Sequence, residues 1–318
     1  MNKVIDFYQN QAKLVEKQTK NSLLIKAPAK VNLTLEILNK RTDGYHELMS
    51  IASVIDFYDI IKISFKKKEK ANQASILFDS NIKNFDFLNH NNVVKAARQF
   101  LLNFAPPIYN YYRINIYLNK QIPVGSGLGG SSTDIVGVVY TFIQLFKIKI
   151  NARQLMGFFN SLGSDLLIFY YSGMTVLSSR GDQAKRITGS GIRAPILLVL
   201  NYNKIYKTKD IFDSYKLKIT KKPGQTLTLL KVLKNQPDWL EKIAKLLYND
   251  LEKATRVEQG YLKTIKQNLL QQGALGTVMS GSGPSVMAIF KNNNKLKKAY
   301  KNLKVAWPDL TMVKLLKK

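Results

Sequence analysis

The stretch Gln121-Ile122-Pro123-Val124-Gly125-Ser126-Gly127-Leu128-Gly129-Gly130-Ser131-Ser132-Thr133-Asp134 joins an expected strand, residues 112–118, to a strongly apolar segment, residues 135–146. Four glycines remove the Cβ atoms that would keep a ligand away from the backbone: Gly125, Gly127, Gly129 and Gly130. A hydroxyl residue at 131–133 can cap a helix that begins there. Backbone N–H groups in a loop that opens onto a helix N-terminus favour phosphate binding. From this loop alone, a flexible turn before a core helix remains the alternative.

Two better-known phosphate loops do not fit this stretch. A Walker loop ends in Gly-Lys-Ser/Thr, whereas Gly130 is followed directly by Ser131. The spacing G-x-G-x-x-G is present, but Pro123 interrupts the preceding strand and no acidic residue stands about twenty positions further on to bind a ribose. A dinucleotide-binding fold is therefore not predicted.

The composition is that of a folded globular protein. With 318 residues and 45% hydrophobic content, the chain can fill the core of one large or two ordinary domains. It has no cysteine, which excludes disulfides and thiolate zinc sites, and its two histidines, His46 and His90, are too few to form a metal cluster alone. A bound metal would be hard and oxygen-ligated, which favours Mg²⁺.

The N-terminal twenty residues lack the apolar core of a signal peptide, and no segment approaches the length of a membrane span. We therefore expect a cytoplasmic protein with no membrane partner. The net charge of +28 comes from lysines scattered from Lys3 to Lys318. Such a field attracts polyanions and anionic small substrates alike, and a lysine-rich genome would produce it without any partner.

The pattern of elements predicts an α+β protein. Residues 4–17 can form an amphipathic helix, and we treat residues 1–21 as an N-terminal extension. Residues 22–37 alternate like a strand, with Pro28 marking a break or a sheet edge and with one face shared by Lys30, Asn32, Thr34 and Glu36.

Further strands are expected at 51–65, 112–118 and 166–178, the last with a turn at Gly173, and helices at 91–101 and 151–162. A domain boundary is expected near residue 190. Beyond it lie a strand at 194–200, helices at 227–247 and 256–271, strands on either side of the turn at 281–284, a helix at 295–303 and a strand at 311–316. This order resembles a ferredoxin-like sandwich.

Taken alone, several polar residues have ordinary interpretations. Asp165, after Gly163 and Ser164, reads as a turn residue, and Lys30 fits a solvated lysine of a strand as well as a functional one. His46, in the turn Asp43-Gly44-Tyr45-His46, is by itself a typical turn histidine, and the turn at 281–284 fits a plain hairpin.

Three separated segments together resemble motifs one, two and three of the GHMP kinases, which phosphorylate small-molecule alcohols with ATP. They are Pro28-Ala29-Lys30-Val31-Asn32, residues 123–132, and Gly281-Ser282-Gly283-Pro284-Ser285. The segments 41–48, 163–165 and 249–252 resemble the branch of this family that acts on a cytidine-diphosphate-linked methylerythritol in isoprenoid precursor biosynthesis. The resemblance spans nearly everything after residue 22. It implies a two-domain fold: a ribosomal-protein-S5-like N-terminal, ATP-binding domain at 22–190 and a ferredoxin-like C-terminal domain at 191–318.

The resemblance also implies the roles of individual residues. Asp165 would be the base for the substrate hydroxyl, held by Lys30, in a phosphoryl transfer that needs ATP and Mg²⁺. The residues implied at ATP are Asn91 and Lys120 near the adenine, with Pro123, Gly125, Gly127, Leu128, Gly129, Gly130 and Ser131 in the phosphate loop, and Ser132 and Thr133 near the metal and phosphates. Those implied at the substrate are Tyr45, His46 and Phe212 around the cytosine, and Asn32 and Thr208 at the remainder.

Some positions depart from the family pattern. Ser131 replaces a glycine and Thr133 a serine, Leu166-Leu167-Ile168-Phe169 replaces Val-Pro-Phe-Phe, and Ser179-Arg180-Gly181-Asp182 replaces Gly-x-Gly-Glu. A Cβ at 131 would clash if that residue needed a positive φ. The alternatives are a relative that takes another alcohol, or one that binds nucleotide without turnover, and a polyanion- or nucleic-acid-binding protein. No specific nucleic acid is expected, because no basic-aromatic recognition motif is present. We expect a monomer or a homodimer.

Overall fold

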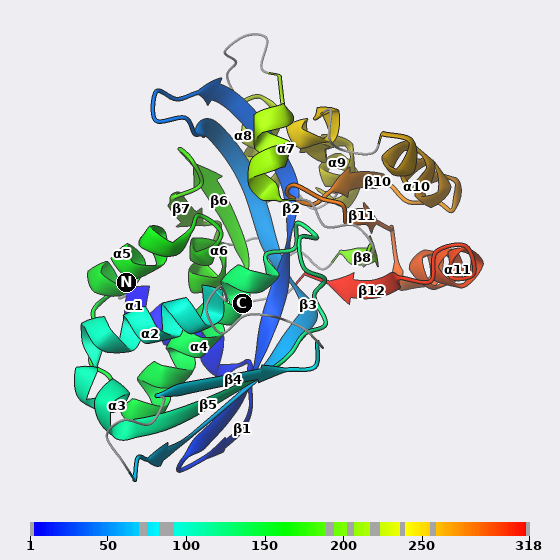
Figure 1. Ribbon diagram of the computed structural model, residues 1–318. Helices are drawn as coiled ribbons and strands as arrows, with labels where there is room; N and C mark the ends of the chain where they lie inside the picture. Colours follow the sequence, from blue (N-terminus) through cyan, green and yellow to red (C-terminus); the bar gives the residue numbers. More distant parts are fainter. Residues whose placement is uncertain are drawn as a thin grey trace. The chain divides into compact units, whose positions relative to one another are not determined.

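The structure, a computed structural model, describes residues 3–69, 75–82, 92–188, 194–201, 207–216, 223–235, 239–254 and 259–315 (Figure 1). Its chain forms two compact units. The first unit comprises Met1–Ala29, Phe57–Ile122 and Gly130–Tyr171, and the second comprises Lys30–Asp56, Pro123–Gly129 and Ser172–Lys318. The sequence-based division at residue 190, with an extension at 1–21, stays a prediction.

The first unit contains strands that carry the chain into the glycine-rich loop. β1 (Val15–Thr19) pairs antiparallel with the start of β2 (Ser22–Lys40), and the end of β3 (His46–Lys67) pairs antiparallel with β5 (Tyr112–Asn119). β4 (Ile76–Ser80) runs parallel to β5. The strands expected at 22–37, 51–65 and 112–118 are confirmed.

Helices supply the core of the first unit. They are α1 (Lys3–Ala12), α2 (Asn92–Phe104), α3 (Pro106–Tyr111), α4 (Gly130–Phe146), α5 (Ala152–Leu162) and α6 (Leu166–Tyr171). Every residue of α4 from Thr133 to Ile143 is buried, as expected for a helix that is apolar on nearly all sides. α2 and α6 both pack against it. α5 begins with a capping box, in which the Asn151 side chain accepts from the N–H of Gln154 at 2.9 Å.

The N-terminal helix belongs to this core. The ring of Phe7 is fully buried and stacks on Tyr170 at 5.1 Å between centroids, with Tyr140 at 5.9 Å and Phe159 at 6.2 Å. Gln11 also donates to the carbonyl of Phe169 at 2.9 Å. Removing α1 would therefore open a cavity among the three remaining aromatic rings.

Three local expectations were wrong. The helix expected over residues 4–17 ends at Ala12, and strand β1 begins at Val15. Residues 166–171 form helix α6 and not a strand; all residues from Leu166 to Tyr170 are buried, so the segment lacks the periodicity that distinguishes a buried helix from a buried strand. The break expected at Pro28 is also absent, since β2 continues through it, whereas the alternative of a sheet edge agrees with the strand pairing. β1 pairs with β2 only as far as Ile25, and β9 (Tyr248–Asn249) pairs with β2 from Thr34 onward. Pro28, which has no N–H to donate, lies on β2 between these two paired stretches.

The second unit contains the part of β2 that follows Ala29 and the part of β3 that precedes Phe57. β6 (Met174–Ser178) pairs antiparallel with β3, Ser50 opposite Leu177, and β7 (Gln183–Arg186) pairs with β6. β9 runs parallel to β2. The remaining helical elements are α7 (Thr208–Ser214), α8 (Gln225–Asn235), α9 (Trp239–Leu246), the short 3₁₀ helix Asp250–Lys253, α10 (Gln259–Gln271) and α11 (Asn293–Leu303).

The second unit also contains a separate four-stranded antiparallel sheet. Its order is β10 (Gly276–Met279), β11 (Val286–Ile289), β8 (Pro195–Val199) and β12 (Leu310–Lys314), and α10 and α11 lie against it (Figure 1). Numbered by their order in the sequence, the four strands lie in the sheet in the order second, third, first and fourth. This is the ferredoxin-like arrangement that the sequence predicted.

Within the described residues, no helix is long and apolar enough to cross a membrane.

Candidate active site

The glycine-rich loop adopts a conformation that only glycine accommodates readily. Gly125, Gly127 and Gly129 have φ of 68°, 77° and 72°, so the backbone is left-handed at every second residue. A Cβ on Gly127 would lie 2.0 Å from the carbonyl oxygen of Ser280. The loop is therefore closely packed against its neighbours at Gly127, and the flexible-turn interpretation is wrong there.

The turn at 281–284 braces this loop within the second unit. The hydroxyl of Ser280 donates to the carbonyl of Gly127 at 3.0 Å, and the N–H of Ser285 donates to the carbonyl of Ser126 at 3.3 Å. The third motif thus holds the second from both of its flanks, which a plain hairpin would not do.

The first motif also contacts the loop. On β2, the N–H of Lys30 donates to the carbonyl of Leu128 at 2.9 Å, and the N–H of Asn32 donates to the hydroxyl of Ser280 at 3.3 Å. All three motifs therefore meet in the second unit, although they are about a hundred residues or more apart in the sequence.

Lys30 is a buried lysine and not a solvated one. Its side chain is 3% exposed, and its Nζ donates to Oδ1 of Asn32 at 2.6 Å. Asn32 is fixed in turn by donating to the hydroxyl of Ser50 at 2.8 Å. A Cβ on Gly281 would lie 3.1 Å from this Nζ, so the ammonium packs directly against the third motif. The predicted shared face of β2 is confirmed, since Thr34 and Glu36 both contact Thr226 while Lys30 and Asn32 contact each other.

The start of α4, in the first unit, carries the rest of the phosphate motif. Gly130 begins the helix and Ser131 follows with helical backbone, so the concern that a Cβ at 131 would be strained is removed. Ser131 is exposed and Ser132 is half-buried, whereas Thr133 is only 2% exposed. Ser131 and Ser132 can therefore reach a ligand at this helix N-terminus more readily than Thr133.

Lys120 is held by two buried carboxylates of the first unit. Its Nζ donates to Oδ2 of Asp134 at 2.8 Å and also to Oδ2 of Asp59. Burial lowers the pKa of Lys120, but the two carboxylates outweigh it, so that the pKa is raised. Burial raises the pKa of Asp134 to about 8, with Lys120 opposing the rise and Asp59 adding to it. The expected contact of Lys120 with adenine stays a prediction.

Asp165 stands in the turn between α5 and α6 in the first unit. It is half-buried, and its carbonyl accepts from the N–H of Ile168 at 3.1 Å, which starts the short helix. Asn91 lies outside the described residues. The structure thus gathers Lys30, Asn32 and the loop in one unit and describes Asp165, Lys120 and the start of α4 in the other.

The residues predicted around the cytosine lie near one another in the second unit. The ring of His46 is 5.7 Å from that of Phe212, on α7, at a tilt of 38°. His46 is 7% exposed while its neighbour Tyr45 is 57% exposed. Burial and Lys40 lower the pKa of His46, against the opposing effect of Asp213. The hydroxyl of Thr208, at the start of α7, is 3.1 Å from that of Ser282, which links this segment to the third motif.

Sequence reasoning missed the residues that hold these motifs in place. The Nδ2 group of Asn249 donates to the carbonyls of Met279 and Gly281, both at 2.8 Å, and Glu252 accepts from the N–H of Met279 at 2.8 Å. Asp59 accepts from the N–H groups of residues 121 and 122 at 2.6 and 2.8 Å, directly before the loop. For Asp59, the available signal was a carboxylate inside the apolar strand of residues 51–65. For Asn249 and Glu252, it was that the segment 249–252 supported the resemblance, although no role was assigned to it.

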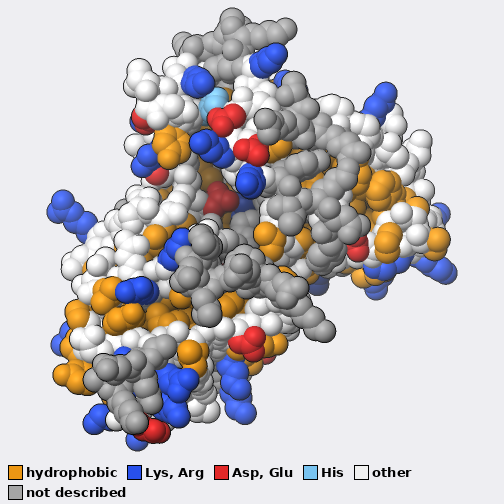
Figure 2. Space-filling view, in the orientation of Figure 1, with side chains coloured by type: hydrophobic (Ala, Val, Ile, Leu, Met, Phe, Trp, Pro, Cys, Tyr) orange, Lys and Arg blue, Asp and Glu red, His pale blue; other side chains and the backbone are white. Residues whose placement is uncertain are grey.

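Basic side chains are dispersed over the described part of the face that Figure 2 shows. Figure 2 shows lysine and arginine side chains scattered across the visible face and separated by polar and apolar atoms, without one continuous patch. In the described part of the chain, no three His, Asp or Glu side chains gather in a group that could hold a metal ion.

Comparisons with known proteins show the family to which the chain belongs. Residues 91–173 match the family described as GHMP kinases N terminal domain, and residues 229–309 match GHMP kinases C terminal. The 4-diphosphocytidyl-2-C-methyl-D-erythritol kinase of Caldanaerobacter subterraneus subsp. tengcongensis is 32% identical over 93% of this chain and 98% of its own. The enzyme of the same name from Clostridium botulinum is 33% identical over 91% of this chain and 98% of its own.

Solved structures show the same fold. A crystal structure of 4-(cytidine 5'-diphospho)-2C-methyl-D-erythritol kinase covers 93% of this chain and all of its own, with a TM-score of 0.73 at 22% identity. A homoserine kinase from Cytophaga hutchinsonii covers 95% of this chain and 96% of its own, with a TM-score of 0.70 at 20% identity. The chain is an ATP-dependent small-molecule kinase that belongs to the GHMP kinases and, within them, to the family of the 4-diphosphocytidyl-2-C-methyl-D-erythritol kinases.

Proposed function

We propose that the protein transfers the γ-phosphoryl group of ATP to a hydroxyl of 4-diphosphocytidyl-2-C-methyl-D-erythritol. The observation that carries this proposal is the contact between the rings of Phe212 and His46, the latter next to Tyr45 in the sequence, in a chain that is 32% identical to a kinase named for this substrate. Aromatic rings provide faces for a pyrimidine base, and a neutral imidazole can both donate and accept at the base edge. The lowered pKa of His46 favours that neutral form.

The nucleotide triphosphate would be bound by main-chain groups. The left-handed glycines turn the loop without side chains in the way, and the loop leads into the N-terminus of α4, where N–H groups and the helix dipole attract phosphate. The hydroxyls of Ser131 and Ser132 add hydrogen-bond donors there. Because these groups are fixed before ATP binds, little ordering is needed during the reaction.

We assign Asp165 as the base that accepts the proton of the substrate hydroxyl, and Lys30 as the cation that the transferring phosphoryl group and this carboxylate require. Asp165 is held at a helix start, and the Lys30 ammonium is buried and oriented by Asn32. Phosphoryl transfer depends mainly on positioning and charge neutralisation, so two groups of opposite charge suffice on the protein side.

Mg²⁺ is expected to enter with ATP. This ion prefers oxygen ligands and is commonly bound through phosphates and one or two protein groups. That suits a site that offers the Ser132 hydroxyl and, among the residues that the structure describes, no group of three His, Asp or Glu side chains. When bound, it would neutralise charge on the transferred phosphoryl group. A cytoplasmic location and a monomeric or dimeric state stay predictions.

The test follows ADP release with ATP, Mg²⁺ and the cytidine-diphosphate substrate. Asp165→Asn and Lys30→Met should each lose at least about a hundredfold in kcat, as expected for a general base and for a cation at the reacting group. Lys26→Met, on the same strand but with a side chain 37% exposed, and Asp79→Asn, an exposed carboxylate on β4, serve as matched controls that should keep wild-type rates. Substrate-independent ATPase of equal size in all five proteins would reject the proposal.

A further inference from the structure

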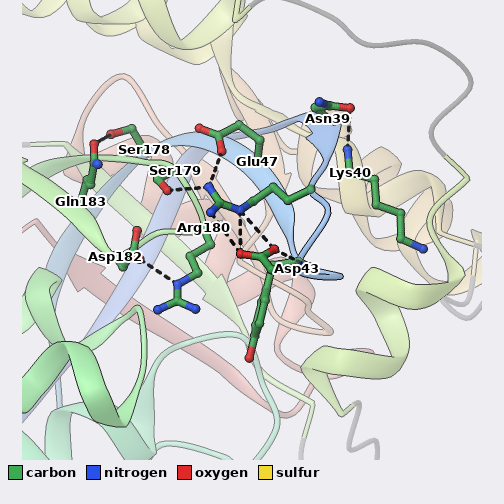
Figure 3. Close-up of polar contacts among 11 residues, drawn as sticks. Asn39, Lys40, Asp43, Glu47, Ser178, Ser179, Arg180, Asp182 and Gln183 are labelled. Atoms are coloured by element: carbon green, nitrogen blue, oxygen red, sulfur yellow. Dashed lines mark hydrogen bonds and ion pairs between the residues drawn. The ribbon is translucent and has the colours of Figure 1, made fainter.

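A network of charged side chains joins two turns of the second unit (Figure 3). One turn, residues 41–47, carries Tyr45 and His46 and is called the Tyr45 turn; the other, residues 179–182, follows β6 and is called the Arg180 turn. Arg41 connects them. Its Nη1 donates to Oε2 of Glu47 at 3.0 Å and to the hydroxyl of Ser179 at 3.1 Å.

Arg41 also closes the Tyr45 turn on itself. Its Nε lies 3.1 and 3.2 Å from the two carboxylate oxygens of Asp43, and its backbone N–H donates to the carbonyl of Tyr45 at 2.8 Å. Asp43 in turn accepts from the N–H of Tyr45 at 3.1 Å. A planar guanidinium that satisfies a carboxylate with several parallel bonds fixes orientation as well as distance. The backbone that carries Tyr45 is therefore held at both ends.

The Arg180 turn is shaped to meet this network. Ser179 has φ of 61°, a left-handed conformation that is uncommon outside glycine. Its hydroxyl contacts Arg41, and its carbonyl accepts from the N–H of Leu48 at 2.7 Å. A serine at this position thus adds a contact that glycine could not make, which offsets its unfavourable backbone conformation.

Arg180 reaches from its turn to the ring of Tyr45. Its guanidinium carbon lies 5.2 Å from the ring centroid, a distance at which a cation is attracted to the aromatic face. Asp182 holds the arginine by accepting from its Nε at 2.7 Å. Although partial desolvation opposes it, the N–H of Tyr45 and the guanidiniums of Arg41 and Arg180 lower the pKa of Asp43, which keeps the carboxylate of this network charged.

We infer that Arg180 and Arg41 are positioning residues that set the affinity for the pyrimidine nucleoside diphosphate part of the substrate. Tyr45 is 57% exposed, so without a partner its ring would be free to change rotamer. Arg180 covers one face of the ring and leaves the other for a base, while Arg41 fixes the turn beneath it. This inference rests on the proposed function, because it assumes that Tyr45 borders the base.

The test compares Arg180→Gln, Arg180→Lys and Gln183→Ala, the last being an exposed residue that follows the same turn. Arg180→Gln should raise KM for the cytidine-diphosphate substrate about two- to fivefold, the equivalent of one exposed cation–π contact, with kcat and KM for ATP unchanged. Arg180→Lys, which keeps the positive charge, should recover part of the loss, and Gln183→Ala should match wild type. Arg41→Met should raise KM further, because it releases the turn as well as the ring.

A double-mutant cycle isolates the ring contact. In a Tyr45→Leu background, Arg180→Gln should have no further effect on the binding of cytidine diphosphate measured by calorimetry. An equal effect of Arg180→Gln with and without the Tyr45 ring, or an unchanged KM in the single variant, would overturn the inference while leaving the proposed function intact. If the wild-type protein neither binds cytidine diphosphate nor turns over the substrate, it is the proposed function that fails.

Discussion

Lys120, Asp59 and Asp134 form a buried cluster in which Lys120 supplies the positive charge. Replacing Lys120 with methionine removes this charge and nearly keeps the volume of the side chain. The side chains of Lys120, Asp59 and Asp134 are 5%, 0% and 2% exposed, so water cannot take the place of the lost ammonium. Removing one partner of a buried ion pair costs about 3–5 kcal/mol of unfolding free energy, since it leaves a buried charge uncompensated. We therefore expect Lys120→Met to be destabilised by that amount at pH 7.

The matched control is Lys26→Met. Lys26 pairs with Glu16 at 2.5 Å, but the two side chains are 37% and 43% exposed, and such surface pairs contribute about 0–1 kcal/mol. Urea unfolding followed by far-UV circular dichroism measures both variants on the same scale. Equal and small losses in the two variants would contradict the view that the cluster is dry and charged.

The same cluster predicts the effect of Asp134→Asn. The pKa of Asp134 is raised to about 8 from 3.8, so the folded protein holds a proton that the unfolded chain releases between these values. Its stabilising contribution is complete below about pH 4 and is lost as the pH rises from there through 8, by about 1.4 kcal/mol per pH unit. Asn mimics the protonated carboxyl, so this variant should match wild-type stability near pH 4, lack that slope up to pH 8, and be more stable than wild type at pH 7. Identical slopes in both proteins would refute the assigned pKa.

Three further predictions concern the loop, its brace and the base pocket. Gly127→Ala should lower the free energy of unfolding by the about 1–2 kcal/mol that a left-handed alanine costs, plus the cost of a contact at 2.0 Å. Gly44→Ala, at φ 83° with nothing within 4 Å of the added Cβ, should show only the first cost. Urea unfolding measures both variants, and equal losses would contradict the packing argument. Asn249→Ala should be destabilised by about 2–3 kcal/mol because three buried hydrogen bonds are lost, and a loss under about 1 kcal/mol would show that the brace is unimportant. The pKa of His46 is lowered from 6.5, so its contribution to the free energy of unfolding should be fully present above about pH 6.5 and be lost as the pH falls through the pKa of the folded protein. His46→Gln should flatten this dependence when the free energy of unfolding is measured against pH.

The motifs were readable from the sequence because each depends on local backbone chemistry. Glycines at 125, 127 and 129 are required by left-handed φ angles within one short loop, and no distant residue is needed to recognise that requirement. The ferredoxin-like order of strands β8, β10, β11 and β12 was likewise predictable, since strand and helix periods follow from the alternation of apolar residues along each segment. Where that alternation is absent, as in the fully buried run 166–170 of helix α6, the prediction was wrong.

Side-chain partners across long separations could not be read in the same way. The pattern around Lys30 suits an exposed lysine equally well, and only the fold shows that its ammonium is buried against Asn32 and packed next to Gly281. Asp59 and Asn249 hold backbone groups that lie 30 or more residues away, and no local spacing connects them. Local patterns reveal what a segment's backbone must do, whereas burial and charge pairing arise only when segments far apart in the chain come within a few ångströms and exclude water.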